Sequence, residues 1–314
     1  MVGQEVALHD VWASNLEEEF ANMRVLASKA THIIAAIEFP GVCMTPLGTF
    51  FSREQYSYQQ LLVNVNALKP IQFGFTFVHD SPTHGQSQMS VWQFNLHFDR
   101  EEDMFTNEAI EAYEQAGFNF QRHSTDGVKL LDFGDLLTTS GVIASKLTWV
   151  SYHSAFDFGF LTRSVCGGAL PADIREFYRM FRKYFKVAFD VKQLLWHPLL
   201  KRKQLTPTMS LQEIATALNI PRWGFRHQAA SDSVMTARVF FQLKSELNNS
   251  WNEISHQICG LINGVGGEPV LPQGAVIQAI FTRESSVVNS PRKANNVDKR
   301  DPLHSYAQIR AVAN

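Results

Sequence analysis

The spacing of apolar residues changes about one third of the way along the chain, and this change limits the folds that the chain can adopt. Residues 71–79 and 90–98 alternate apolar with polar side chains, and turn-forming residues lie between them, so a β-hairpin is predicted. Farther on, the patterns predict helices over residues 105–116, 133–140, 154–165, 172–185, 192–198, 210–218 and 227–247, and strands over residues 147–152 and 187–191. A hairpin followed by this alternation is typical of an α/β fold with a mixed central sheet flanked by helices.

The segment before the hairpin predicts one helix and one buried strand. Apolar side chains repeat at helical spacing over residues 11–30, and Ser14 with Glu17 three residues later is a capping-box pattern. The apolar run over residues 32–38 predicts a buried strand, and the Pro-Gly pair at 40–41 ends it.

The domain boundaries follow from where these patterns begin and end. We expect an N-terminal extension over residues 1–10, one domain over residues 11–264 and a disordered tail over residues 265–314, which is rich in Ser, Asn, Arg and Lys. A domain of this length can bury a sizeable core without disulfides. Hydrophobic residues make up 45% of the chain and charged residues 18%, which is ordinary for a globular protein.

Charge and cysteine content narrow the class of protein further. The formal net charge is −2, so the whole surface is not a nucleic-acid-binding surface and any RNA contact must be local. The three cysteines are odd in number and widely spaced, which argues against a disulfide framework and favours a reducing compartment. No apolar run is long enough to cross a membrane, and the N-terminus lacks the pattern of a signal peptide. We expect a soluble intracellular protein without a membrane partner.

Three carboxylates lie in apolar surroundings. Glu38 ends the predicted buried strand, Asp157 lies among three phenylalanines, and Asp232 follows two alanines and a serine. Each alone could be a helix cap or half of an ion pair, because burying an unpaired carboxylate is unfavourable. Three together suggest oxygen ligands for Mg²⁺.

A histidine precedes the third carboxylate by five residues. If His227 lies just before a helix that begins near residue 228, its ring can face the same site as Asp232. A histidine in this place could act as a general base on an attacking water, or it could be a capping or surface residue.

These segments together match a known family. Ile37-Glu38-Phe39-Pro40-Gly41, Ser151–Leu161 around Asp157, and His227–Ser233 resemble the three motifs of the DEDDh exonucleases. With Trp92-Gln93-Phe94-Asn95, Leu137–Gly141 and Phe189-Asp190-Val191-Lys192, they resemble more narrowly the Caf/Pop-type deadenylase subunit of the carbon catabolite repressor–Not complex. The resemblance extends from about residue 10 to residue 264.

The resemblance implies a fold, a reaction and partners. The fold would be ribonuclease H-like. The reaction would be 3′-to-5′ hydrolysis of poly(A) RNA with release of 5′-AMP in mRNA decay, with two divalent metal ions, Mg²⁺ or Mn²⁺. The partners would be the Not scaffold subunit and a second deadenylase subunit, in the cytoplasm with the nucleus as a second compartment. By position, Glu38, Asp157 and Asp232 match metal ligands and His227 matches the general base.

One position departs from the family pattern. The first motif normally carries an aspartate two residues before the glutamate, and this chain has Ala36 there. Residues two apart on a strand face the same side, so the site lacks one of four carboxylates. Loss of a ligand shared by two ions would lower the rate roughly 10²-fold or more. The alanine is consistent with an active-site mutant or with a natural pseudonuclease, and Asp190 is a candidate to complete the site.

The sequence is also consistent with two other functions and with other roles for two of its features. The chain could be a non-catalytic scaffold that joins the Not subunit to a second nuclease, or a DNA exonuclease on the same fold. Phe39 could stack on an adenine or belong to the core. The basic cluster at residues 201–203 could contact RNA phosphates or lie in a solvated loop.

Overall fold

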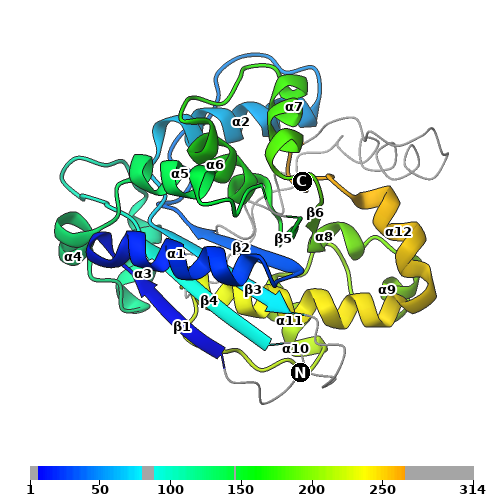
Figure 1. The fold of residues 1–314 in the computed structure, drawn as a ribbon. Helices are drawn as coiled ribbons and strands as arrows, with labels where there is room; N and C mark the ends of the chain where they lie inside the picture. The colour runs from blue at the N-terminus through cyan, green and yellow to red at the C-terminus, as the bar shows by residue number, and fades with distance from the viewer. Residues whose placement is uncertain (1–5, 80–87, 145, 266–314) are drawn as a thin grey trace.

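The computed structural model describes residues 6–79, 88–144 and 146–265, and it contains one sheet between two layers of helices (Figure 1). The strands are β1 (Val6–Val11), β2 (His32–Glu38), β3 (Gln72–His79), β4 (Gln88–Asn95), β5 (Thr148–Ser151) and β6 (Ala188–Asp190). Their order in the sheet is β1-β4-β3-β2-β5-β6. β3 pairs antiparallel with both neighbours, and the other pairs are parallel. The predicted mixed α/β sheet is therefore confirmed.

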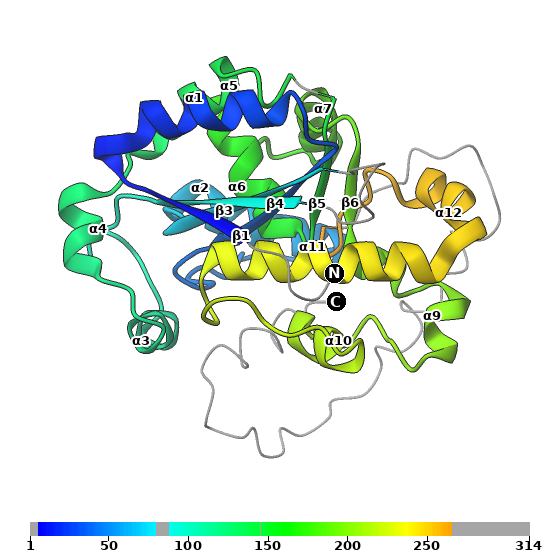
Figure 2. The ribbon, with the colours of Figure 1, turned by 60° about the horizontal axis from the view of Figure 1, so that its bottom comes forward.

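The helices surround this sheet and form its covering layers. They are α1 (Leu16–Ala27), α2 (Arg53–Ala67), α3 (Asn107–Gln115), α4 (Phe120–Asp126), α5 (Leu130–Thr139), α6 (Ala155–Cys166), α7 (Ile174–Tyr184), α8 (Val191–Leu194), α9 (Pro198–Arg202), α10 (Leu211–Ala217), α11 (Ala229–Leu247) and α12 (Trp251–Ile258), with 3₁₀ turns at Ala13–Asn15 and Asn248–Ser250. Figure 2 shows α11 across one face of the sheet and α1, α5 and α6 on the other.

Alternation along β2 assigns its side chains to the two faces. Ile33, Ala35 and Ile37 belong to the larger core, which includes side chains of α1, α2, α5 and α6. Ile34 belongs to the second core, which α11 covers. Ala36 shares the face of Ile34, and it is the one residue of β2 that is not fully buried. The strand therefore opens toward solvent at position 36 on the side where α11 begins.

The hairpin is also confirmed. β3 and β4 pair antiparallel, with Gln72 opposite Asn95 and His79 opposite Gln88. Phenylalanines on β3 and β4 pack with Phe133 of α5, whose ring stacks on Phe73 at a centroid distance of 4.6 Å. The abundant phenylalanine of this chain thus fills the space between the sheet and the helices on that face.

Several details of the sequence prediction were wrong. Residues 6–10 form most of β1 and pair with β4, so they belong to the sheet instead of to an N-terminal extension. The first helix begins at Leu16 with Asn15 as its N-cap, and no side-chain hydrogen bond caps it, so the predicted Ser14 cap is wrong. Helices α2, α4, α9 and α12 were missed.

Two further predictions concern the chain ends and membranes. The predicted tail over residues 265–314 lies, apart from its first residue, outside the described residues. Across the described ranges, no helix is both long and apolar enough to span a bilayer.

Candidate active site

A cavity of about 420 Å³ opens where several chain segments meet at one edge of the sheet. Its lining combines Ala36 and Ile37 of β2 with residues 151–153 at the end of β5, Asp157 of α6, Lys192 of α8, residues 208–213, the loop before α11, and Asp232 and Thr236 of α11. Three predicted site residues, Asp157, His227 and Asp232, line this cavity together with Ala36. The fold thus brings together segments that are nearly two hundred residues apart.

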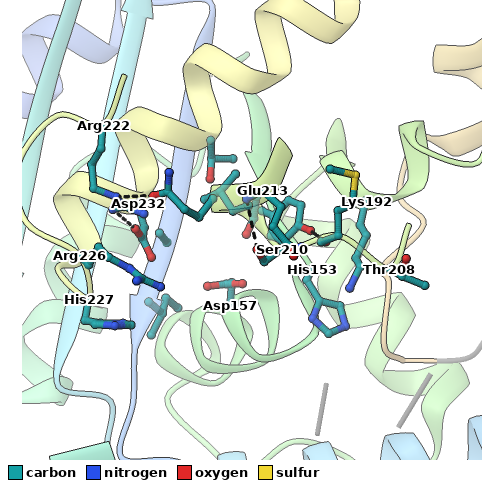
Figure 3. Close-up of a pocket in the computed structure, with 18 residues that line it drawn as sticks. His153, Asp157, Lys192, Thr208, Ser210, Glu213, Arg222, Arg226, His227 and Asp232 are labelled. Carbon is teal, nitrogen blue, oxygen red and sulfur yellow. Dashed lines mark hydrogen bonds and ion pairs between the residues drawn. The ribbon is translucent and has the colours of Figure 1, made fainter. Parts of the chain in front are cut away.

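Two of these carboxylates lie in the first turns of helices. Asp157 is in the first turn of α6 and is 5% exposed. Asp232 is in the first turn of α11. The free backbone N–H groups and the dipole at a helix N-terminus favour negative charge, so both positions support an ionised carboxylate. Figure 3 shows Asp157 between Asp232 with its neighbours on one side and His153 with Lys192 on the other.

Asp232 is paired with an arginine. Arg222 Nη1 lies 2.6 Å from Asp232 Oδ1, and the same guanidinium donates to Ser231 Oγ at 2.9 Å and to Gln212 Oε1 at 3.0 Å. A bound cation would have to share Asp232 with this guanidinium. Arg222 also ties the loop before α11 to α10 and α11, which fixes the wall of the cavity.

Two histidines of the cavity have left-handed backbones. His153 has a φ of +54° and His227 a φ of +62°, which side chains with a Cβ adopt at a cost of about 1–3 kcal/mol. Each lies just before the helix that carries a carboxylate, α6 for His153 and α11 for His227. His153 is held by Asp190, whose Oδ1 accepts a hydrogen bond from His153 N at 2.9 Å. This strain beside both carboxylates is typical of a functional site.

Glu38 lies apart from this cavity lining. Its Oε2 is 3.0 Å from the Tyr113 hydroxyl, which is also 2.8 Å from the carbonyl oxygen of Phe39. Glu38 is 9% exposed and is not among the residues that line the cavity. Ala36 faces the same side of β2 as Glu38 and does line the cavity, so an aspartate at 36 would face the cavity.

The residues present do not fit a pair of divalent metal ions. Within the part of the chain that the structure describes, no three His, Cys, Asp or Glu side chains are grouped closely enough to hold a metal. The cavity is lined by three acidic residues (Asp157, Glu213 and Asp232) and by three basic residues (Lys192, Arg222 and Arg226). Two divalent ions need an excess of negative oxygen ligands, which this lining does not provide.

Asp190, the candidate to complete the site, has a different role. Its Oδ1 accepts from His153 N and Lys192 N, and its Oδ2 accepts from Ser154 N, Ser154 Oγ and Asn263 N, all at 2.8–2.9 Å. The side chain is fully buried. Asp190 therefore holds the loop that leads into α6 and does not reach the cavity.

Two further candidates for contact with RNA, Phe39 and residues 201–203, lie outside the cavity lining. Phe39 is 3% exposed, and its ring stacks on Phe156 at 4.6 Å, so it belongs to the core and offers no face to a base. The basic cluster at residues 201–203 spans the end of α9, away from the cavity lining, and Lys203 pairs with Glu246.

Five histidine or charged residues of the cavity lining were not predicted from the sequence: His153, Lys192, Glu213, Arg222 and Arg226. Lys192 lies in a segment that carried the family resemblance, which was a usable signal. The two arginines lie in a loop without periodicity, so no sequence pattern indicated that they face the carboxylates.

The chain matches one protein-family model over most of its length. The model of the CAF1 family ribonucleases matches residues 11–134 and 137–240. The chain is 42% identical over 267 residues to "CCR4-NOT transcription complex subunit 7" of Caenorhabditis elegans, covering 83% of this chain and 84% of that protein. It is 36% identical over 239 residues to "Poly(A) ribonuclease pop2" of Schizosaccharomyces pombe, covering 76% of this chain and 69% of that protein.

Solved structures agree with this match. S. pombe Pop2p in its Mg²⁺- and Mn²⁺-bound form is 33% identical with a TM-score of 0.73, covering 82% of this chain and 99% of that one. Yeast CAF1 crystallised with the NOT1 MIF4G domain is 28% identical with a TM-score of 0.64, covering 81% of this chain and 96% of that one. The expected ribonuclease H-like fold is confirmed, and the chain belongs to the CAF1 ribonuclease family.

Proposed function

We propose that this chain is a subunit of a CCR4-NOT-type complex that receives the 3′ end of poly(A) RNA in the cavity but hydrolyses it far more slowly than an intact site would. The observation that carries this proposal is Ala36, which lines the same cavity as Asp157, His227 and Asp232. The family match and the relative named as a poly(A) ribonuclease support the RNA substrate. They favour it over the DNA-exonuclease alternative.

The side chains of the cavity have separable roles in this proposal. Lys192, Arg222 and Arg226 supply positive charge for phosphates of the RNA. His227 is the residue that would take a proton from the attacking water. Divalent metal ions supply a polarised water and stabilise the leaving oxygen in two-metal nucleases. Glu38, Asp157 and Asp232 match the family's ligand positions for Mg²⁺ or Mn²⁺, but in this chain they would be too few to hold two ions.

Hydrolysis is weak in this proposal because the shared ligand is missing. Three carboxylates remain where four are expected, and Arg222 already occupies one oxygen of Asp232. The loss should lower the rate roughly 10²-fold or more, at about 1.4 kcal/mol per factor of ten. The product of the residual reaction would be 5′-AMP, released from the 3′ end.

A second candidate function is a non-catalytic scaffold. The likeness to yeast CAF1 crystallised with the NOT1 MIF4G domain supports a place on the Not scaffold, where this chain would link the scaffold to a second deadenylase. Ala36 favours this role because a scaffold does not need its metal ligands. The cytoplasm, with the nucleus as a second compartment, is the proposed location for either function.

Shortening of a 5′-labelled RNA that ends in poly(A) tests the two functions. The assay compares the native chain, Ala36→Asp, and Ala36→Asp combined with Asp157→Ala, first in Mg²⁺ and then in Mn²⁺. We expect tail shortening by Ala36→Asp at a rate roughly 10²-fold or more above the native chain, and loss of that gain in the double variant. If Ala36→Asp does not shorten the tail, the nuclease proposal is wrong and the scaffold function stands.

A further inference from the structure

A band of basic side chains follows the outer side of α7. Residues 174–186 contain five basic residues and one acidic residue, a local charge of +4, whereas the rest of the chain carries −6. The basic residues are Arg175, Arg179, Arg182 and Lys183 of α7 and Lys186 just after it, and we call them the α7 basic face. Basic residues clustered along one helix in an otherwise acidic chain are the electrostatic pattern of a nucleic-acid contact.

The helix geometry places most of these cations on one side. At 100° per residue, Arg175, Arg179, Arg182 and Lys183 fall within an arc of about 100° and along about 12 Å of helix. The opposite side buries Phe177, Tyr178 and Phe181 in the core. Figure 1 shows α7 at the periphery of the molecule, beside α6. The α7 basic face is therefore directed away from the core.

Two carboxylates, Asp173 at the N-cap of α7 and Glu176 in its first turn, offset these charges in part, and residues 173–186 still carry +3. Glu176, the acidic residue of α7, is 3.6 Å from Arg179, and both side chains are more than half exposed, so the pair is weak. Arg182 lies over the ring of Tyr178 at 5.0 Å, which leaves its charge in place. Arg175, Lys183 and Lys186 are exposed.

A chain of contacts links α7 to the wall of the cavity. Tyr178 of α7 and Ile262 are both buried in the larger core. The next residue, Asn263, donates its backbone N–H to Asp190 at 2.9 Å, and Asp190 holds His153. The helix that carries the basic residues thus packs on the segment that supports the His153 side of the cavity.

We infer that the α7 basic face binds the phosphate backbone of single-stranded RNA upstream of the 3′ end that enters the cavity. This inference rests on the proposed function, since it takes the RNA as the ligand of the cavity. A membrane fits this helix poorly, because its large apolar side chains face the core and leave no apolar band for lipid. Phosphates need only the exposed cations.

RNA binding by matched charge variants tests the inference. One variant carries Arg175→Gln, Arg179→Gln, Lys183→Gln and Lys186→Gln, and it leaves Arg182 on Tyr178 undisturbed. The control variant carries Arg24→Gln, Lys29→Gln, Lys201→Gln and Arg202→Gln, four exposed positions on other elements, so both variants have the same net charge. Fluorescence anisotropy measures binding of a short oligo(A) and of a longer RNA with the same 3′ end, over a series of salt concentrations.

We expect the α7 variant to bind the longer RNA about tenfold or more weakly at low salt, and the control variant to bind it nearly as well as the native chain. The slope of log K against log salt should fall by about 0.7 for each phosphate contact that is lost. The short oligo(A) should bind all three proteins alike. Equal losses in both variants, or no loss in the α7 variant, would overturn the inference. Failure of the native chain to bind the short oligo(A) would count against the cavity as the RNA site, which is a separate result.

Discussion

Asp190 is a buried carboxylate whose role is structural. Five donors from three separate segments converge on its two oxygens, and the carboxylate has no exposure to solvent. These segments are the loop before α6, the start of α8 and the segment after α12. The side chain therefore sets the position of His153 and of the first turn of α6, where Asp157 lies.

Removing this carboxylate should destabilise the fold strongly. In Asp190→Ala, several buried N–H groups lose their acceptor, and we expect a loss of about 3–5 kcal/mol in the free energy of unfolding. Urea denaturation followed by tryptophan fluorescence measures this loss. Asp135→Ala, which removes an exposed carboxylate on α5, is the matched control and should change stability by no more than about 0.5 kcal/mol. Similar values for the two variants would show that Asp190 has no special structural role.

At this scale, the sequence predicted part of the site. The sequence predicted three residues that line the cavity together: Asp157, His227 and Asp232. Each lies in or beside the first turn of a helix, and the apolar pattern of the neighbouring segments indicated where these helices begin. Arg222 could not be predicted, because its contact with Asp232 depends on the path of an irregular loop. Phe39 could not be assigned from sequence either, since a phenylalanine next to a strand end fits the core and a binding surface equally.

At the scale of elements, the close approach of α11 to β3 positions Asp232. An ideal Cβ on Gly74 would lie 2.2 Å from the carbonyl carbon and oxygen of Ala229. Ala36 pairs with Gly74 across β2 and β3, so the start of α11 passes directly over the strand position next to Ala36. The absence of a side chain at 74 lets the first turn of α11, with Asp232, reach the edge of the cavity.

Gly74→Ala should push this helix away from the sheet. The added methyl meets backbone atoms, which cannot rotate aside, so we expect a loss of about 1–3 kcal/mol in the free energy of unfolding. Thermal and urea denaturation measure it. Gly168→Ala is the control, because a Cβ there has no heavy atom within 4 Å. A Gly74→Ala protein as stable as the Gly168→Ala protein would refute the close-packing explanation.

The elements themselves were largely predictable where their pattern was periodic. The predictions of the hairpin and of the alternating strands and helices after it were correct. Apolar side chains repeat every two residues in a strand and every 3.6 residues in a helix, and these two spacings are easy to tell apart. Helix α2 was missed because much of its surface is polar, with only part of one side buried against α6. Strand β1 was missed because it lies at the edge of the sheet and most of its residues are exposed or half-buried.

At the scale of the whole molecule, the fold separates its charges. The chain is slightly acidic, yet the cavity lining balances acidic against basic residues and α7 concentrates a charge of +3. A nuclease that depends on two divalent ions requires an excess of negative charge in its cavity. The charge distribution here suits phosphate binding better than metal binding, and the missing carboxylate at position 36 accounts for much of that difference.

Calorimetric titration with Mn²⁺ tests whether the carboxylate missing at position 36 weakens metal binding, because it measures metal binding without requiring turnover. The native chain and Ala36→Asp are titrated under the same conditions, and Ala36→Asn serves as a control that restores side-chain size without the charge. We expect Ala36→Asp to bind Mn²⁺ at least about tenfold more tightly than the other two proteins, a difference of about 1.4 kcal/mol. Equal affinity of the native chain and Ala36→Asp would contradict it, because the carboxylate at position 36 would then not be what the metal site lacks.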